Sequence, residues 1–234
     1  MLPEYEYCRS EFEAAGLELS HELYEKLDIY ADFLIEYNKN VNLTAISEPV
    51  EVLRKHFIDS IILSKYVDIP ENSAIIDVGT GAGFPSIPLK LYRPDIRITL
   101  LDSLNKRIEF LKLLCGKLDI EAEFIHGRAE NLSKKPEYRE MFDFSCARAV
   151  ANLSLLSEFC IPFVKVGGSF ISMKGPNENI CEGENAVALL GGMIEKVTEY
   201  ELFDEKRRII LINKISHTPS KYPRNSGQIK KKQL

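Results

Sequence analysis

The feature that most constrains the fold is a short β-branched run that leads directly into three alternating glycines. The run spans residues 74–78 (AIIDV) and is followed by GTGAGFP at 79–85. A buried strand that passes at once into a glycine-rich turn is typical of open α/β sheets, which bind ligands at the carboxyl ends of their strands. The glycines let the backbone turn sharply and approach a ligand closely.

Further strand-like segments follow, and helical segments separate them. They are 96–102, 121–127, 142–148 and 168–175. This alternation predicts right-handed crossovers and a parallel sheet with helices on both faces. The end of the pattern differs, because residues 193–203 and 207–215 predict two strands of an antiparallel hairpin joined by the tight turn FDEKR.

The segment 1–70 shows helical periodicity and no strand signal. Ser20 is expected to cap a helix that reaches Tyr37, and Pro49 to begin a second helix that ends near Val67. Between them, residues 37–47 are predicted to form a loop.

We therefore predict an α/β fold with a doubly wound Rossmann-like sheet, a C-terminal antiparallel hairpin and an N-terminal helical extension. The expected units are the helical extension at 1–70, the sheet domain at 71–214 and a basic tail at 215–234.

Composition narrows the class of protein. The chain has 234 residues, 45% of them hydrophobic, and a net charge of -5, so it can bury a core and stay soluble. No apolar run approaches the ~20 residues that cross a bilayer, and the acidic N-terminus lacks the apolar core of a signal peptide. The five cysteines are scattered without a CxxC pair, which argues against structural zinc or a disulfide framework and favours a reducing cytoplasm.

The glycine loop also indicates a ligand. A dinucleotide-binding fingerprint needs glycine at position 84, where Phe84 would crowd a pyrophosphate. Alternating glycines after Asp77 suit S-adenosylmethionine better. This ligand has no phosphate, and an acid at the loop can help to meet its cationic amino group. Asp102 ends the second strand, downstream of Gly83, and could accept both ribose hydroxyls of a nucleoside. Its alternative role is to cap the next helix.

Other polar residues follow the third and fourth strands, at the same predicted edge of the sheet. Ala129 and Glu130 follow the third strand, and Arg148 ends the fourth. Glu130 taken alone is more typical of a solvated helix start than of a ligand, and only together with the other residues of this edge are the two interpretations balanced. For Arg148 the alternative to a functional role is a salt bridge to Asp102 or Glu130.

Segments across nearly the whole chain resemble one family, the bacterial ribosomal RNA small subunit methyltransferase G family, also called glucose-inhibited division protein B. The matching segments are NKNVNLTAI (38–46), RKHFIDS (54–60), DVGTGAGFPSIPL (77–89), LLDSLNKRIEFL (100–111), GRAEN (127–131), FDFSCARAVANL (142–153) and KYPRNSGQIKKKQL (221–234). The resemblance implies a cytoplasmic S-adenosylmethionine-dependent enzyme that methylates N7 of one guanine in small-subunit rRNA. It implies that the cofactor lies against Gly79, Phe84, Ala129, Glu130 and Arg148, with Asp102 at the ribose, and that no metal is needed.

The chemistry of this reaction agrees with what the sequence lacks. Guanine N7 has an in-plane lone pair and loses no proton, so no general base is required. No Asn/Asp-Pro-Pro-aromatic turn follows the fourth strand, and no Pro-Cys pair follows a strand. We expect Arg148 to be the catalytic charge, reaching guanine O6, and not to form a stabilising ion pair. Cys146 and His56 are expected to be structural.

Two other function classes stay open on the residues alone. One is a nucleotide-dependent oxidoreductase on the same fold, which Phe84 disfavours. The other is a non-catalytic rRNA-binding assembly factor, which the intact glycine loop disfavours. Within the methyltransferase class, an enzyme that acts on protein or small molecules is a further alternative, which the basic tail disfavours.

The expected partner is small-subunit rRNA or the small ribosomal subunit, bound by a monomer. The C-terminal segment 221–234 holds five bases and no acid. We expect the segment from Lys221 to Lys232 to hold rRNA phosphates, and Tyr222 and Pro223 to pin the chain or stack on a base. The alternative is a disordered terminus whose lysines aid solubility. The five bases are Lys221, Arg224, Lys230, Lys231 and Lys232.

Overall fold

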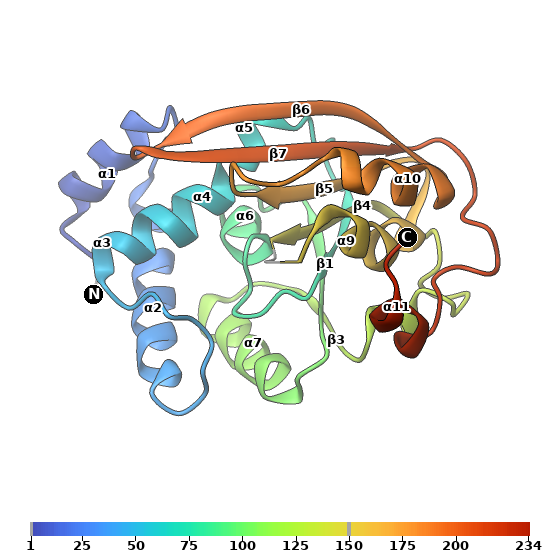
Figure 1. Cartoon of the computed structure of the whole chain (residues 1–234). Coiled ribbons are helices and arrows are strands. Elements are labelled where there is room, and N and C mark those ends of the chain that lie inside the picture. Colours follow the sequence, from blue (N-terminus) through green and yellow to red (C-terminus); the bar gives the residue numbers. More distant parts are fainter. Residues whose placement is uncertain (1, 149–150) are drawn as a thin grey trace.

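The computed structural model describes residues 2–148 and 151–234. At its centre lies a seven-stranded sheet with the order β3-β2-β1-β4-β5-β7-β6 (Figure 1). The strands are β1 (Ala74–Val78), β2 (Arg97–Asp102), β3 (Glu123–His126), β4 (Phe142–Arg148), β5 (Val164–Lys174), β6 (Gly192–Leu202) and β7 (Glu205–Lys214). Strands β1 to β5 pair in parallel, and β7 joins β5 antiparallel, so the predicted doubly wound sheet with a C-terminal hairpin is confirmed.

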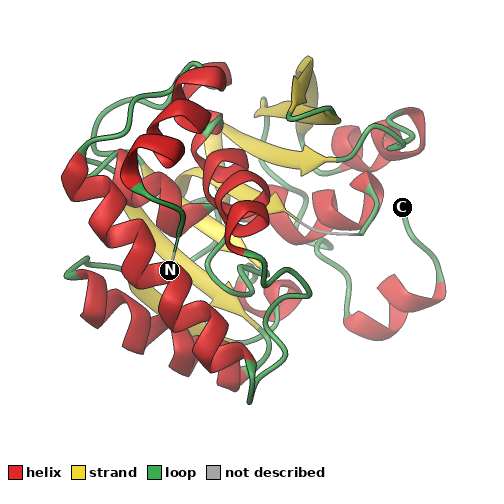
Figure 2. Ribbon diagram, turned by 90° about the vertical axis from the view of Figure 1, so that its left-hand side faces the viewer, coloured by secondary structure: helices red, strands yellow, loops and turns green. Residues whose placement is uncertain are grey.

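Helices cover both faces of the sheet (Figure 2). Before the sheet lie α1 (Tyr5–Ala14), α2 (His21–Asn38), α3 (Pro49–Val52), the π-helix η1 (Leu53–Ile58), α4 (Asp59–Ile61) and α5 (Leu63–Tyr66). Within and after the sheet lie α6 (Ser86–Tyr92), α7 (Asn105–Leu118), α8 (Ala129–Leu132), α9 (Leu153–Cys160), the 3₁₀ helix η2 (Ile161–Phe163), α10 (Cys181–Leu189) and α11 (Ser226–Lys231).

Alternation along the strands divides the core into two layers. Ile75 packs in one hydrophobic cluster and its neighbour Ile76 in the other, because successive side chains of a strand point to opposite faces. The first cluster contains the apolar faces of α1, α2, α6 and α7, and the second contains those of α9 and α10. The N-terminal helices therefore share one core with the sheet. The division into units at 1–70, 71–214 and 215–234 stays a prediction.

Local signals set the ends of the N-terminal helices as expected. The Ser20 side chain accepts the N–H of Leu23 and so caps α2, as predicted. The helical stretch from Pro49 to Tyr66 is also confirmed. Its middle, Leu53–Ile58, is π-helical, which the sequence pattern did not indicate.

The hairpin turn is shorter than predicted. Phe203 and Asp204 alone connect β6 to β7, with φ of +51° and +64°. Two left-handed residues match the right-handed twist of paired strands. The remaining residues of FDEKR continue into β7, which therefore begins at Glu205.

In the described ranges, 2–148 and 151–234, no helix has both the length and the apolarity to cross a bilayer.

Candidate functional site

The glycine loop is held by hydrogen bonds to the two strands it joins. The N–H groups of Gly79 and Thr80 donate to the Leu101 carbonyl at 2.8 and 3.1 Å. Below the loop, the fully buried Asp77 carboxylate accepts the Thr80 hydroxyl at 2.9 Å and the N–H of Ser86 at 3.3 Å. Burial raises the pKa of Asp77 to about 7, and these hydrogen bonds oppose that rise.

The glycines of the loop have different roles. A Cβ on Gly79 would meet nothing within 4 Å, and one on Gly81 only the Gly79 carbonyl at 3.9 Å. A Cβ on Gly83 would clash with Ile87 Cδ1 at 2.6 Å and the Tyr30 hydroxyl at 2.8 Å. Gly79 and Gly81 therefore leave an open space above the loop, whereas Gly83 allows α2 to pack closely.

Asp102 connects the loop to the next strand. Its carboxylate is buried and accepts the N–H of Gly81 at 3.0 Å, the N–H of Leu104 at 2.9 Å and Arg107 Nη1 at 3.2 Å. The helix-capping role considered for Asp102 is not found, because the N-cap of α7 is Leu104, α7 has no side-chain cap hydrogen bond, and the only backbone N–H that Asp102 accepts at this helix start is that of Leu104 itself. The same carboxylate also borders the open space beside Gly81.

The segment after β3 lies against Asp102. The N–H of Gly127 donates to the Asp102 carbonyl at 3.0 Å. Ala129 and Glu130, in the first turn of α8, are both buried, and Arg128 Nη1 lies 3.9 Å from a Glu130 carboxylate oxygen. Glu130 is therefore not a solvated helix-start residue. The structure gathers Gly79, Asp102, Ala129 and Glu130 at one edge of the sheet.

Arg148 is directed toward the N-terminal helices. Its Nη1 donates to the Lys55 carbonyl and to Asp59 Oδ2, both at 2.9 Å, and its Nη2 lies 3.2 Å from His56 Nδ1. The salt bridge to Asp102 or Glu130 considered from the sequence is wrong, because the partner is Asp59.

The prediction that Arg148 is free of a stabilising ion pair is also wrong. Its side chain is 18% exposed and that of Asp59 is 7% exposed, so the pair is largely withdrawn from water.

The π-helical turn explains why Arg148 finds a backbone acceptor. The N–H groups that close η1 bond to the carbonyls of Arg54, His56 and Phe57. The Lys55 carbonyl accepts from Arg148 instead. A π-helical turn shifts the backbone ladder by one residue and is frequently found at functional sites.

Phe84 is the centre of an aromatic stack. Its ring lies 5.4 Å from that of Tyr30 and 4.3 Å from that of His56, with interplanar angles of 10° and 17°. The Arg148 guanidinium lies 4.8 Å from the same ring. The Phe84 side chain is thus used in packing, and its cofactor contact stays a prediction.

His56 is buried and electrically neutral. Burial, and then the charge of Arg148, lower its pKa to about 3. Because an Arg N–H can only donate, His56 Nδ1 accepts, and its Nε2 carries the proton that is donated to Thr44 Oγ1 at 2.9 Å. The expectation that His56 is structural is supported, although its partner Arg148 belongs to the site.

A cleft of about 570 Å³ opens beside Arg148 and His56, at the carboxyl ends of β4 and β5. Cationic side chains dominate its lining, and two acids accompany them. The charged lining residues are Lys55, Asp59, Arg148, Lys174, Glu178 and Arg207. Each of the four cations is paired with a carboxylate: Lys55 with Glu51 and Glu205, Arg148 and Arg207 with Asp59, and Lys174 with Glu178.

The family comparison agrees with the site. The model of one family, rRNA small subunit methyltransferase G, matches residues 23–210. The chain belongs to this family.

Curated relatives in the family match almost the whole chain. The Ribosomal RNA small subunit methyltransferase G of Clostridium perfringens (strain SM101 / Type A) is 44% identical over 235 residues, covering 98% of each chain. That of Clostridium kluyveri is 48% identical over 223 residues, covering 94% of each chain.

Solved methyltransferase structures share the fold. TrmN from Thermus thermophilus matches with a TM-score of 0.55 and 15% identity, over 70% of this chain and 53% of that one. A SAM-dependent methyltransferase from Aquifex aeolicus matches with a TM-score of 0.54 and 16% identity, over 70% and 93%. The sheet of this family member is therefore the Rossmann-like sheet of methyltransferases.

Three residues around Arg148 and His56 had no predicted role, namely Thr44, Asp59 and Arg207. Two of them lie in segments that resemble the family. Thr44 belongs to NKNVNLTAI and Asp59 to RKHFIDS, so the resemblance itself was the available signal. Arg207 carried no such signal, and its Nε lies 3.4 Å from Asp59 Oδ1. Residues 149 and 150 of the matching segment ARAVANL lie outside the described residues.

Cys146 is buried, and its Sγ lies 3.4 Å from Ser86 Oγ. Burial raises the pKa of the Cys146 thiol well above its usual value, in agreement with the predicted structural role. In the described part of the chain, no three His, Cys, Asp or Glu side chains gather as metal ligands do.

Two residues of the basic tail are engaged by the rest of the fold. Arg224 donates to the Glu158 carboxylate from both Nε and Nη2, and that carboxylate is only 1% exposed. Tyr222 is buried in the second core cluster. Arg224 is therefore engaged by Glu158, so not all five bases are free to hold phosphate. The buried Tyr222 pins the chain, which is one of the two roles expected for it.

Proposed function

We propose that this chain transfers a methyl group from S-adenosylmethionine to N7 of a guanine in small-subunit rRNA, in the cytoplasm. Membership of the rRNA small subunit methyltransferase G family carries this proposal. The open loop, and the cleft lined by Arg148 at the carboxyl ends of β4 and β5, support it. The finer expectations, a monomer acting on rRNA or on the assembled small subunit, belong to the same proposal.

The residues at the loop fit S-adenosylmethionine. The space above Gly79 and Gly81 is free of side chains, so a ligand can lie directly on the backbone. We assign Asp102, whose carboxylate is already held in place, to the ribose hydroxyls, and Ala129 and Glu130 to the adjacent part of the nucleoside. The bound cofactor would supply an electrophilic methyl group at this edge of the sheet.

The nucleophile needs orientation more than activation. Guanine N7 presents a lone pair in the plane of the ring and loses no proton on methylation. Holding that lone pair in line with the methyl group therefore provides much of the rate. The neutral state of His56 agrees with this requirement, since no base has to be charged or discharged in the site.

Arg148 is suited to orient the guanine. An arginine side chain has five N–H donors. The contacts to Lys55, Asp59 and His56 occupy three of them. The Nε–H and one Nη2–H are left to reach guanine O6, which lies next to N7 on the same edge of the base. We therefore assign Arg148 as the catalytic residue that positions the guanine.

The experiment is methyl transfer from labelled S-adenosylmethionine to small-subunit rRNA that lacks the modification. Free rRNA and assembled subunits are assayed side by side, and digested product is analysed for N7-methylguanine by mass spectrometry. We expect N7-methylguanine at one site. Labelling of a different atom, or none in a protein that binds S-adenosylmethionine, would overturn the proposal. Titration with NADH tests the oxidoreductase alternative.

A further inference from the structure

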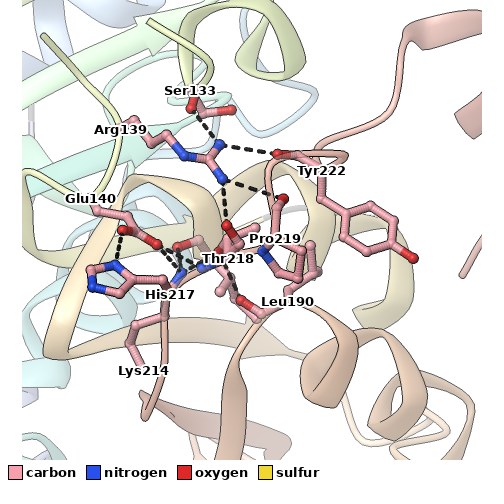
Figure 3. Close-up of polar contacts among 10 residues, drawn as sticks. Ser133, Arg139, Glu140, Leu190, Lys214, His217, Thr218, Pro219 and Tyr222 are labelled. Carbon is pink, nitrogen blue, oxygen red and sulfur yellow. Dashed lines mark hydrogen bonds and ion pairs between the residues drawn. The ribbon is translucent and has the colours of Figure 1, made fainter. Parts of the chain in front are cut away.

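The chain ends in a segment, 217–234, that we call the C-terminal strap. Figure 3 shows how its beginning is fastened to the domain. Arg139 donates through Nη2 to the carbonyls of Thr218 (2.7 Å) and Pro219 (3.4 Å), and through Nη1 to that of Tyr222 (3.0 Å). A single guanidinium thus holds three carbonyls of the strap.

The adjacent Glu140 adds a second fastening point. Its carboxylate accepts the N–H of Thr218 at 2.7 Å and lies 2.5 Å from His217 Nδ1 (Figure 3). The buried Lys214, at the end of β7, lies 3.2 Å from the same carboxylate. The strap therefore leaves the sheet through a fixed set of polar contacts.

The middle of the strap is buried against α9. Arg224 and Glu158 form a bidentate ion pair with distances of 2.7 to 3.2 Å. The side chains of Tyr222 and Ile229 are buried. Asn225 begins α11 with a complete capping box. These contacts order the strap, which is not a frayed terminus.

The end of the strap lies at the beginning of α9. Asn152 Nδ2 donates to the Gln233 side chain at 2.5 Å, and the Ser154 hydroxyl donates to the Leu234 main-chain oxygen at 3.0 Å. The N–H of the intervening Leu153 donates to the carboxylate of Glu178, which lines the cleft. The strap therefore ends beside the cleft.

Three lysines immediately precede this docked end. Lys230, Lys231 and Lys232 are all exposed, and within the ranges that the structure describes none has an acidic partner. The other two bases of the tail differ, since Arg224 is paired and Lys221 Nζ lies 5.2 Å from the Tyr222 ring. Immediately before its docked end, the strap thus presents three exposed lysines without an acidic partner among the described residues.

We propose that Lys230, Lys231 and Lys232 form a fixed clamp for the phosphates of the rRNA strand whose guanine enters the cleft. This inference rests on the proposed function. Because the strap is already ordered, binding RNA does not incur the cost of immobilising a flexible arm. Arg224 and Tyr222 fasten the clamp and do not contact RNA.

The test compares two triple variants that each remove three exposed lysines. The first is Lys230→Gln, Lys231→Gln and Lys232→Gln. The control is Lys112→Gln, Lys117→Gln and Lys165→Gln; Lys117 lies in the last turn of α7, and the other two line a separate cavity at the amino-terminal edge of the sheet. RNA affinity is measured from low to moderate salt, and S-adenosylmethionine affinity is measured on the same samples.

We expect the strap variant to reduce the slope of log affinity against log salt by about 2, from about 0.7 per lost phosphate contact on single-stranded RNA. Its cofactor affinity should equal that of the wild type, and the control variant should keep the wild-type salt slope. Equal slopes for the strap and control variants would overturn the clamp. Failure of the wild-type protein to methylate rRNA would instead overturn the proposed function.

Glu158→Gln tests whether the clamp must be fixed. This change removes an acid, so simple electrostatics predicts stronger RNA binding. We expect weaker binding at every salt concentration with the wild-type slope, because the lysines remain while the fastening at Arg224 is weakened. RNA binding that becomes stronger would show that a fixed position is unimportant and would contradict the proposal.

Discussion

Arg148 and Asp59 form a largely buried ion pair with an Nη1–Oδ2 distance of 2.9 Å across 89 residues of sequence. The pair joins the end of β4 to the first residue of α4. Asp59 also faces Arg207 of β7, so one carboxylate connects the N-terminal helices, the parallel sheet and the hairpin. This connection gives Arg148 a structural role in addition to the proposed catalytic one, and the two roles can be separated.

Arg148→Met should lower both stability and turnover. Removal of one partner leaves Asp59 buried with only the longer contact to Arg207, which costs about 3 kcal/mol of unfolding free energy. The double variant Arg148→Met with Asp59→Leu should regain most of that stability, because both buried charges are removed. Its turnover should stay lost. Urea unfolding and methyl transfer check this prediction, and a stable double variant with wild-type turnover would reject Arg148 as catalytic.

Gly81→Val and Gly83→Ala should have different effects. The space beside Gly81 is open, so the valine should mainly obstruct the ligand and weaken S-adenosylmethionine binding by about 2 kcal/mol. Because φ is positive at this position, the valine should also lower the stability of the fold by a smaller amount. The alanine at position 83 would clash with Ile87 and Tyr30 and should chiefly reduce the melting temperature. Calorimetry and thermal unfolding distinguish the two. Unchanged cofactor affinity in a folded Gly81→Val protein would contradict the placement of the ligand.

His56 should make the protein less stable in mild acid. Its pKa is lowered from 6.5 to about 3, so the unfolded chain binds the proton first as the pH falls below 6.5. Between pH 7 and pH 5 this should cost about 2 kcal/mol of unfolding free energy. His56→Phe retains a ring against Phe84 and removes the titrating group, so the loss should disappear. An identical pH dependence in urea unfolding of the two proteins would refute this assignment.

Asp77 should make the protein less stable as the pH rises, which is opposite to the effect of His56. Its pKa is raised from 3.8 to about 7, so the folded state holds its proton more tightly and stability is lost as the pH rises from about 4 to about 7. Asp77→Asn mimics the protonated carboxyl and should abolish that loss. The measurement is the unfolding free energy at pH 5, 6 and 7 for both proteins. A variant that loses as much stability as the wild type over this range would show that Asp77 is ionised throughout.

The sequence alone predicted most of the fold, because its signals are local. The β-branched run and glycines at 74–83 place β1 and the loop, Ser20 caps α2, and alternating apolar residues mark the hairpin. Backbone conformation at each of these places depends on residues within a few positions, so a linear pattern contains the information. The edge of the sheet at which the candidate cofactor residues lie was also predictable, because the carboxyl ends of parallel strands meet at one edge.

The partners of the charged side chains were decided only by the tertiary structure. Arg224 has no acid near it in the sequence, yet it binds Glu158, 66 residues away, and Arg148 binds Asp59 and not the carboxylates at its own sheet edge. A charge at the end of a long side chain can reach any element that packs nearby, and burial then determines which carboxylate is left without water and must be paired. The π-helical turn at Leu53–Ile58 belongs to the same category, because its displaced Lys55 carbonyl is satisfied by a residue from a distant strand. The sequence by itself therefore determined the sheet, its glycine loop and the family, whereas long-range packing determined which cations fasten the fold and which remain free to meet a ligand.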